Sequence, residues 1–364
     1  MNTDPVAEIL SKLSRHRLVL ISGPPGVGKS RLLAQVRDAF EKGAPALPAY
    51  QPTDRSNPFP ARVVPVEGAA DWFPSPSRDN RQVFTTTFHP NYRYRDFMRG
   101  VAPKIGDANG FFVTSGQMYK AALHALNDDG AALLIIDEIN RGPAIQIFGD
   151  SIVAIEGDKR RGQRNVMPFQ VLSDDGEMVD FELPADLYIL AAMNQADTSV
   201  EALDVAFLRR WESYAMEPDE ALLFAHFDVA DDTVAIPEIP TTAQDVYAAA
   251  IRAWVKVNER ISLGRGPEFQ IGHGIFNLGE TPPSDVEGAK SFVTDSWRRI
   301  RVHIGEVFFG SVAGVAAVLN TGVVYNPIKL EEASFGGMPV GRLRGEAEAD
   351  FHDLMRAVAA EDAE

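Results

Sequence analysis

The sequence contains no cysteine. This absence excludes disulfide bonds, zinc sites built from thiolates and cysteine nucleophiles, and it suits a reducing compartment. No segment approaches the length of about 18 uninterrupted apolar residues that a membrane-spanning helix needs. The first residues, MNTDPVAEILSKLSRHRLVLISG, lack the long apolar region and the cleavage site of a secretory signal. We therefore expect a cytoplasmic protein with no membrane contact.

Basic residues are also scarce relative to acidic ones. The chain has 35 Lys and Arg against 51 Asp and Glu, a formal net charge of −16. Such a chain is a poor general binder of polyanions, so any contact with nucleic acid is expected to be local or made by a partner. With 364 residues, 45% of them apolar, the chain is long enough for two or three domains around separate cores.

The first part of the chain alternates between apolar segments and amphipathic ones. Continuous apolar runs predict buried strands, and alternating residues around Asp-Asp-Gly predict a hairpin. Strands alternating with helices favour an α/β fold, a parallel sheet covered by helices. We expect strands at 17–22, 83–88, 131–137 and 187–193, helices at 5–14, 29–40, 116–128 and 143–156, and the hairpin at 168–183.

The second part of the chain predicts a smaller helical domain. Beyond about residue 217 we expect no further strands, because the apolar spacing is helical throughout. The expected division is an α/β domain at 1–217, a helical lid domain at 218–325, and a tail at 326–364 with one helix at 346–360. Residues 43–80 are rich in Pro, Ser and Asp without periodicity, which predicts a long loop insertion.

A glycine-rich segment, GPPGVGKS, follows the first buried strand and opens a helix. It matches the phosphate-loop pattern in the context that supports it. Backbone N–H groups and the helix N-terminus would surround phosphate oxygens, Lys29 would reach the β- and γ-phosphates, and the Ser30 hydroxyl would bind Mg²⁺. The candidate nucleotide-binding residues here are Gly23, Pro24, Gly26, Val27, Gly28, Lys29, Ser30 and Arg31.

Two carboxylates, Asp137 and Glu138, end the apolar strand LLIID. In a parallel sheet the ligand crevice lies at the carboxyl ends of the strands. Asp137 is suited to hold Mg²⁺, and Glu138 to polarise the attacking water. A strand that ends on solvated acids is the alternative, and the phosphate loop upstream favours the catalytic interpretation.

The strand at 187–193 ends on an uncharged amide, Asn194. We expect this strand to lie beside both the phosphate-loop strand and the acidic one, so that Asn194 contacts the γ-phosphate or the water without adding negative charge. A turn cap is the alternative.

Arg209 and Arg210 come about fifteen residues later, and we expect them on the far side of the domain from their own phosphate loop. They are expected to serve a neighbouring subunit in a head-to-tail ring, unless they are simply solvated.

Together these features resemble an AAA+ ATPase, and the similarity to McrB is closer than to the class as a whole. The segments that carry it are TFHPNYRYRDFMRG, GQMYKAAL, IIDEINRGPAIQIFGDSIVAIEGDKR, MNQADTSVEALDVAFLRRW and FQIGHGIFNLG. The resemblance runs from about residue 15 to about 315. It implies a ring, expected to be hexameric, that hydrolyses GTP or ATP with Mg²⁺. It also implies an McrC-like nuclease partner and action on modified DNA through that partner or the pore.

The resemblance also assigns roles by position. Gly26, Gly28, Lys29 and Ser30 would cradle the phosphates and Mg²⁺. Asp137 and Glu138 would be the metal and water residues, with Asn140 beside them. Asn194 would be the sensor residue, which contacts the γ-phosphate or the attacking water. Asp197 belongs to the MNQAD block, which is linked to a preference for guanine nucleotides. Arg209 and Arg210 align with the arginine fingers, which would reach the phosphates of a neighbouring subunit.

Three departures from the McrB pattern limit what is carried over. The motor is expected to start within about twenty residues of Met1, without the DNA-reading domain of the family. The family's M-N-T-A-D is MNQAD here, followed by Thr198 where the family has Arg, and Gln270 replaces the Arg of F-R-I-G-H. Preference for GTP or ATP therefore stays open.

Two other functions remain possible. A MoxR-like chaperone that remodels protein complexes would fit the acidic charge, and a scaffold that binds nucleotide without hydrolysis would not need Glu138.

The segment 157–164 is densely basic, and we expect it to face either a ring pore or solvent. Its basic residues are Lys159, Arg160, Arg161 and Arg164. We expect His273 to be a packed or capping residue rather than a ligand.

Overall fold

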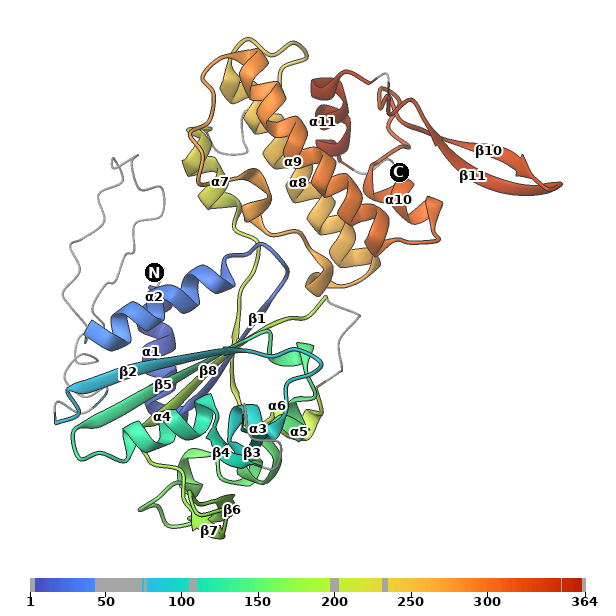
Figure 1. Cartoon of the computed structure of the whole chain (residues 1–364). Coiled ribbons are helices and arrows are strands. Elements are labelled where there is room, and N and C mark those ends of the chain that lie inside the picture. The colour runs from blue at the N-terminus through green and yellow to red at the C-terminus, as the bar shows by residue number, and fades with distance from the viewer. Residues whose placement is uncertain are drawn as a thin grey trace. The chain divides into compact units, whose positions relative to one another are not determined.

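The structure is a computed structural model that describes residues 4–42, 74, 77–104, 110–196, 203–230, 235–347 and 349–361. Its contacts divide the chain into two compact units (Figure 1). The first comprises Met1–Gly23 and Lys29–Met216, and the second comprises Pro24–Gly28 and Glu217–Glu364. Most of the insertion expected at 43–80 lies outside the described residues, as do Asp197 and Thr198.

The first unit is built on a five-stranded sheet in which all paired strands are parallel. The strand expected at 187–193 does lie between the phosphate-loop strand and the acidic one, so the predicted α/β fold is confirmed. Across the sheet the order is β2 (Asn80–Thr87), β5 (Gly130–Asp137), β8 (Leu187–Asn194), β1 (Leu18–Gly23) and β9 (Glu212–Ala215).

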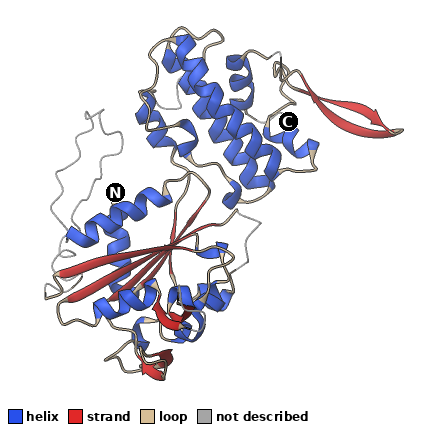
Figure 2. Cartoon of the chain, viewed as in Figure 1, coloured by secondary structure: helices blue, strands red, loops and turns tan. Residues whose placement is uncertain are grey.

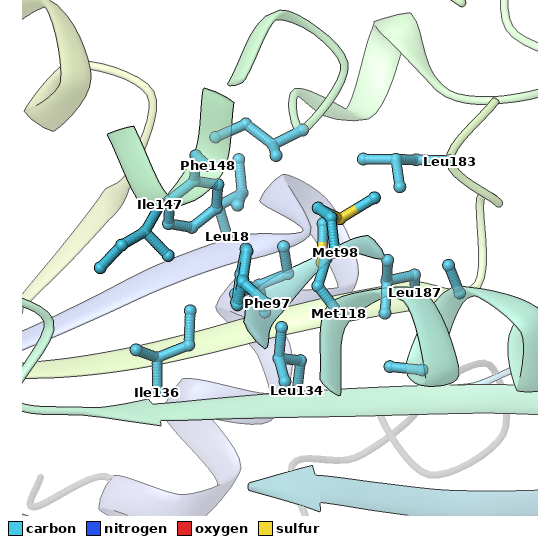
Figure 3. Packing of buried hydrophobic residues seen from close by; sticks show 14 of the residues in the cluster. Leu18, Phe97, Met98, Met118, Leu134, Ile136, Ile147, Phe148, Leu183 and Leu187 are labelled. Atoms are coloured by element: carbon cyan, nitrogen blue, oxygen red, sulfur yellow. The ribbon is translucent and has the colours of Figure 1, made fainter. Parts of the chain in front are cut away.

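Helices cover both faces of this sheet (Figure 1). Val19 and Ile21 of β1 pack with the apolar side chains of α1 (Pro5–His16) and α2 (Lys29–Lys42). Leu18 and Leu20 point to the opposite face, in the second cluster, which Figure 3 shows around Phe97, Met118 and Leu134. Burying each such side chain contributes about 1.5–3 kcal/mol. The two cores therefore make the sheet a firm base for the polar residues at its edge.

The opposite face is covered by short helices and two hairpins. One hairpin, β6 (Phe169–Leu172) with β7 (Met178–Phe181), was expected from the sequence, whereas β3 (Arg99–Pro103) with β4 (Phe111–Ser115) was not. The short helices are α3 (Tyr94–Phe97), α4 (Gln117–Ala125), α5 (Ala144–Phe148) and α6 (Val205–Leu208). The single helix expected at 143–156 is wrong, because α5 stops before Gly149, which has φ 50°, and Gly149–Val153 forms a 3-10 helix.

The second unit is mainly helical (Figure 2). Its long helices bury a continuous apolar stripe that includes Tyr247, Trp254 and Val257 on one and Val293 and Ile300 on the next. The guanidinium of Arg260 is buried and donates to the backbone carbonyls of Val318, Val358 and Ala360. The helices are α7 (Glu220–Phe227), α8 (Ala243–Gly264), α9 (Val286–Val307), α10 (Val312–Val318) and α11 (Phe351–Ala359).

The expectation that strands end near residue 217 is wrong. An antiparallel hairpin, β10 (Lys329–Phe335) with β11 (Met338–Arg344), lies in the second unit. The two glycines at its turn, Gly336 and Gly337, are a recognised hairpin signal. The flanking strands show little alternation because most of their side chains are exposed on both faces.

Candidate functional site

The phosphate-loop segment connects the end of β1 to the start of α2. Gly26 and Gly28 have φ values of 82° and 90°, a left-handed conformation that glycine adopts without a steric cost. The first turn of α2 contains no acidic residue. The partial positive charge at this helix end is therefore not offset by a carboxylate of the helix itself, and it suits an anion.

Lys29 is buried at the start of α2, with 8% of its surface exposed. Burial is the main cause that lowers its pKa, to about 8, while the carboxylates of Glu138 and Asp137 act in the opposite direction. Its Nζ donates a 2.8 Å hydrogen bond to the carbonyl of Gly23. Ser30 follows it and is exposed. The structure thus places the predicted phosphate-binding lysine within the field of the two predicted catalytic acids.

The two acids occupy a sharp turn at the end of β5. Asp137 Oδ1 accepts a 3.0 Å hydrogen bond from the backbone N–H of Glu138. Glu138 has φ 53° and ψ 48°, a left-handed conformation that costs a non-glycine residue roughly 1–2 kcal/mol. Strain of this kind collects at functional sites, where the surrounding structure holds it in place.

Asn194 meets Glu138 at this edge of the sheet. Its Nδ2 donates a 2.7 Å hydrogen bond to Glu138 Oε1, and its own carbonyl accepts a 2.9 Å bond from Nδ2 of Asn140. Asn140 is 5% exposed. Asn140 therefore ties the ends of β5 and β8 together, a bond that no sequence pattern indicates. Arg141, to which the sequence pattern assigns no role, places its Nε 3.3 Å from Glu138 Oε2.

The donors present suit a magnesium ion held with a nucleotide. Among the described residues, no group of three or more His, Asp or Glu side chains could hold a metal alone. Mg²⁺ at nucleotide sites instead takes one or two protein oxygens and completes its shell with water and phosphate. The Ser30 hydroxyl and the Asp137 carboxylate are oxygen ligands of that kind. The predicted metal residues therefore fit Mg²⁺.

The adjacent residues Arg209 and Arg210, which the sequence predicts to act together, have different surroundings in the structure. Arg209 follows α6 and is exposed. Arg210 is partly buried, with its Nε 3.0 Å from Glu156 Oε1 and its Nη1 bonded to the carbonyl of Ala206. Arg210 therefore has partners within its own subunit, whereas Arg209 lies on the surface. A role for either residue at a neighbouring subunit stays a prediction.

By its contacts, the loop Pro24–Gly28 groups with the second unit. The backbone N–H of Gly272 donates to Pro25 O at 3.0 Å, and that of Gly274 donates to Gly26 O at 2.9 Å. A Cβ on Gly272 would lie 2.1 Å from the carbonyl carbon of Gly26. The segment 272–274 thus fixes the loop backbone. Sequence reasoning missed this contact, although the Gly-His-Gly pattern marks it.

The residues around this segment hold it firmly. His273 is buried, and its Nδ1 accepts a 3.1 Å bond from the backbone N–H of Asp219, in agreement with the expected packed or capping histidine. The carbonyl of Ile271 accepts bonds of 3.0 Å from both Trp254 Nε1 and Asn258 Nδ2. The long helix α8 therefore anchors the segment that contacts the phosphate loop.

The basic segment at 157–164 is less basic at the surface than its sequence indicates. Arg160 is fully buried, and its guanidinium donates to the carbonyls of Ile155, Pro184 and Leu187. Burial lowers its pKa. Lys159 lies 3.6 Å from Glu156, so Arg161 and Arg164 are the exposed arginines that remain in the segment. Arg160 is therefore a structural residue rather than part of a pore surface.

Comparison with known proteins gives a consistent result. Residues 12–147 match the family described as AAA domain. The chain is 27% identical over 282 residues to the type IV methyl-directed restriction enzyme EcoKMcrB subunit of Escherichia coli K12, covering 75% of this chain and 50% of that protein. It is 30% identical over 172 residues to the type II restriction enzyme BsuMI component YdiS of Bacillus subtilis 168, covering 38% and 50%.

The chain thus spans about half the length of the curated relatives it matches. Among solved structures, PCH-2 of C. elegans aligns with a TM-score of 0.32 and 12% identity over 81% of this chain and 67% of that one. A score this low supports no further statement. In the part of the chain that the structure describes, no helix has the length and apolar character needed to cross a membrane.

Proposed function

We propose that this chain, which belongs to the McrB-like branch of the AAA+ P-loop proteins, is the nucleoside-triphosphatase motor of a restriction or phage-defence complex. The observation that carries the proposal is the 2.7 Å hydrogen bond between Asn194 and Glu138, formed at the sheet edge that also holds Asp137, where both carboxylates act electrostatically on Lys29 at the start of α2. A carboxylate and an amide in that arrangement suit the activation of a water next to a terminal phosphate.

The residues divide the chemistry between binding and hydrolysis. The phosphate-loop backbone, Lys29 and the N-terminus of α2 would bind the triphosphate. Glu138 would accept the proton of a water that attacks the γ-phosphorus, while the bond to the β-phosphate oxygen breaks. Asn194 would orient the water or the γ-phosphate without adding charge. Bound Mg²⁺, held by Ser30 and Asp137, would neutralise charge on the phosphate oxygens.

The assembly is proposed to be a homo-oligomeric ring, six subunits by the resemblance, in which Arg209 reaches the phosphates of the adjoining subunit. A separate McrC-like nuclease would cut the DNA. Both matched relatives are named as components of restriction enzymes, which favours this function over a MoxR-like remodeller. An adjacent gene that encodes a nuclease of the PD-(D/E)xK class would support the first function, and a von Willebrand-type adhesion domain the second.

Phosphate release tests the proposal directly. Purified protein with Mg²⁺ is given GTP or ATP, with and without the product of the neighbouring gene, and Glu138→Gln serves as the control without the general base. We expect hydrolysis of at least one nucleotide, stimulation by the partner and, in the variant, a large decrease to a slow residual rate. Absence of hydrolysis with either nucleotide, even with the partner present, would show that the chain is not such a motor. Full biological activity of Glu138→Gln would favour a scaffold.

A further inference from the structure

Arg141 ends the 3-10 turn Ile139–Arg141, directly after the two strand-end carboxylates. Its Nε lies 3.3 Å from Glu138 Oε2, an ion pair between residues three apart in the chain. The Arg141 side chain is 50% exposed and that of Glu138 23%. Glu138 Oε2 itself is enclosed and accepts no hydrogen bond from the described residues. The guanidinium therefore covers one oxygen of the proposed general base.

The two oxygens of Glu138 have different partners. Oε1 accepts the 2.7 Å bond from Asn194, and Oε2 faces Arg141. The terminal torsion of a glutamate is broad, so one hydrogen bond leaves the carboxylate plane free to rotate. A second contact, on the other oxygen, removes that freedom. A base that takes a proton from water needs a fixed direction, since small displacements of catalytic groups are costly in rate.

We propose that Arg141 is a positioning residue for hydrolysis that acts through Glu138. It fixes Oε2, so that Oε1, shared with Asn194, faces the water from which the proton is taken. This role rests on the proposed triphosphatase activity. Because Arg141 is half exposed, its ion pair is screened by solvent, and we expect its loss to lower kcat about three- to tenfold rather than abolish turnover.

The experiment compares Arg141→Ala, Arg141→Lys and the control Arg298→Ala. Arg298 forms an ion pair with Asp295, which also lies three residues earlier in the chain, on an exposed stretch of α9 in the second unit. The nitrogen–oxygen distance of this pair is 2.7 Å. Steady-state rates are measured with the nucleotide that the wild type hydrolyses, and affinity with its fluorescent mant derivative. For Arg141→Ala we expect a lower kcat with KM, affinity and melting temperature nearly unchanged. Arg141→Lys should recover part of kcat, and Arg298→Ala should match the wild type.

A double-mutant cycle decides whether Arg141 acts through Glu138. In single-turnover reactions, adding Arg141→Ala to Glu138→Gln should cost no further rate, because the carboxylate it positions is already gone. An equal loss in both backgrounds would place the action of Arg141 elsewhere, for example on a neighbouring subunit, and would overturn the proposal. An unchanged kcat in Arg141→Ala would also overturn it. A wild-type protein that hydrolyses neither nucleotide would overturn the proposed function first, and this role with it.

Discussion

The side-chain amide of Asn194 donates a 2.7 Å hydrogen bond to Glu138, although the two residues are 56 positions apart in the sequence. The contact exists because β5 and β8 are parallel neighbours whose carboxyl ends meet at one edge of the sheet. Asn140 secures the same edge by a bond to the backbone of Asn194.

Replacing Lys29 by Ala should abolish nucleotide binding, because it removes the ammonium expected to contact the β- and γ-phosphates. If subunits assemble on bound nucleotide, assembly should fail as well. Titration with mant-GTP and mant-ATP measures the first effect, and light scattering the second. Lys42→Ala, an exposed lysine at the opposite end of α2, is the control. A Lys29→Ala protein that still assembles on nucleotide would contradict the link between binding and assembly.

Nucleotide affinity should fall as pH rises past about 8. Burial lowers the pKa of Lys29 to about 8, so in the free protein its side chain is mostly charged at pH 7 and mostly neutral at pH 9. Phosphate binding needs the charged form, so binding at pH 9 must be coupled to uptake of a proton. We expect roughly tenfold weaker binding at pH 9 than at pH 7. Lys29→Arg should flatten the profile, and a flat profile for the wild type would argue against this coupling.

Arg209→Ala should bind nucleotide normally but lose hydrolysis, by a factor that reaches ~10³ or more for arginines supplied in trans. Arg209 is exposed, so its side chain is accessible to another subunit. Mixing this variant with Glu138→Gln should restore some turnover, because some interfaces then combine an intact base with an intact arginine. No recovery at any mixing ratio would count against a shared interface.

Arg210→Ala should behave differently from Arg209→Ala and lower the stability of the fold. Arg210 is partly buried and has partners in its own subunit, Glu156 and the carbonyl of Ala206. Removing it leaves Glu156 with only the longer 3.6 Å ion pair to Lys159 and takes a donor from the carbonyl of Ala206, and we expect a loss of about 1–3 kcal/mol in the free energy of unfolding. Chemical denaturation measures this loss, and Glu156→Gln should show part of it. Unchanged stability with lost hydrolysis would assign Arg210 to the interface instead.

Gly272→Ala should weaken both folding of the second unit and nucleotide binding. The added methyl would lie 2.1 Å from the carbonyl carbon of Gly26, so the phosphate-loop backbone would have to move. The expected destabilisation is about 1–3 kcal/mol, typical of overpacking. Gly279→Ala is the matched control, since a Cβ there meets no atom within 4 Å. Equal melting temperatures and affinities for the two variants would show that the loop is not held in this way.

The sequence predicted the components of the site well because each is encoded by consecutive residues. The phosphate loop follows its strand and opens its helix, and apolar runs end on Asp137 and on Asn194. The hairpin β10–β11 was missed although its two turn glycines were visible, because exposed strands carry little apolar alternation. The sequence therefore predicted the segments with distinctive local chemistry and missed the elements with a weak hydrophobic pattern.

By itself the sequence determined four of the five strands of the sheet, their order along the chain and the polar residues at the strand ends, since these follow from local periodicity and backbone chemistry, whereas β9 was not predicted. Only the tertiary structure decided which of those residues touch. It brought Arg141 and Asn194 to opposite oxygens of Glu138 and docked Gly272 on the phosphate loop. It also gave Arg210 an internal partner and buried Arg160 among carbonyls. Burial and long-range pairing depend on how distant segments pack, and no short stretch of sequence specifies that packing.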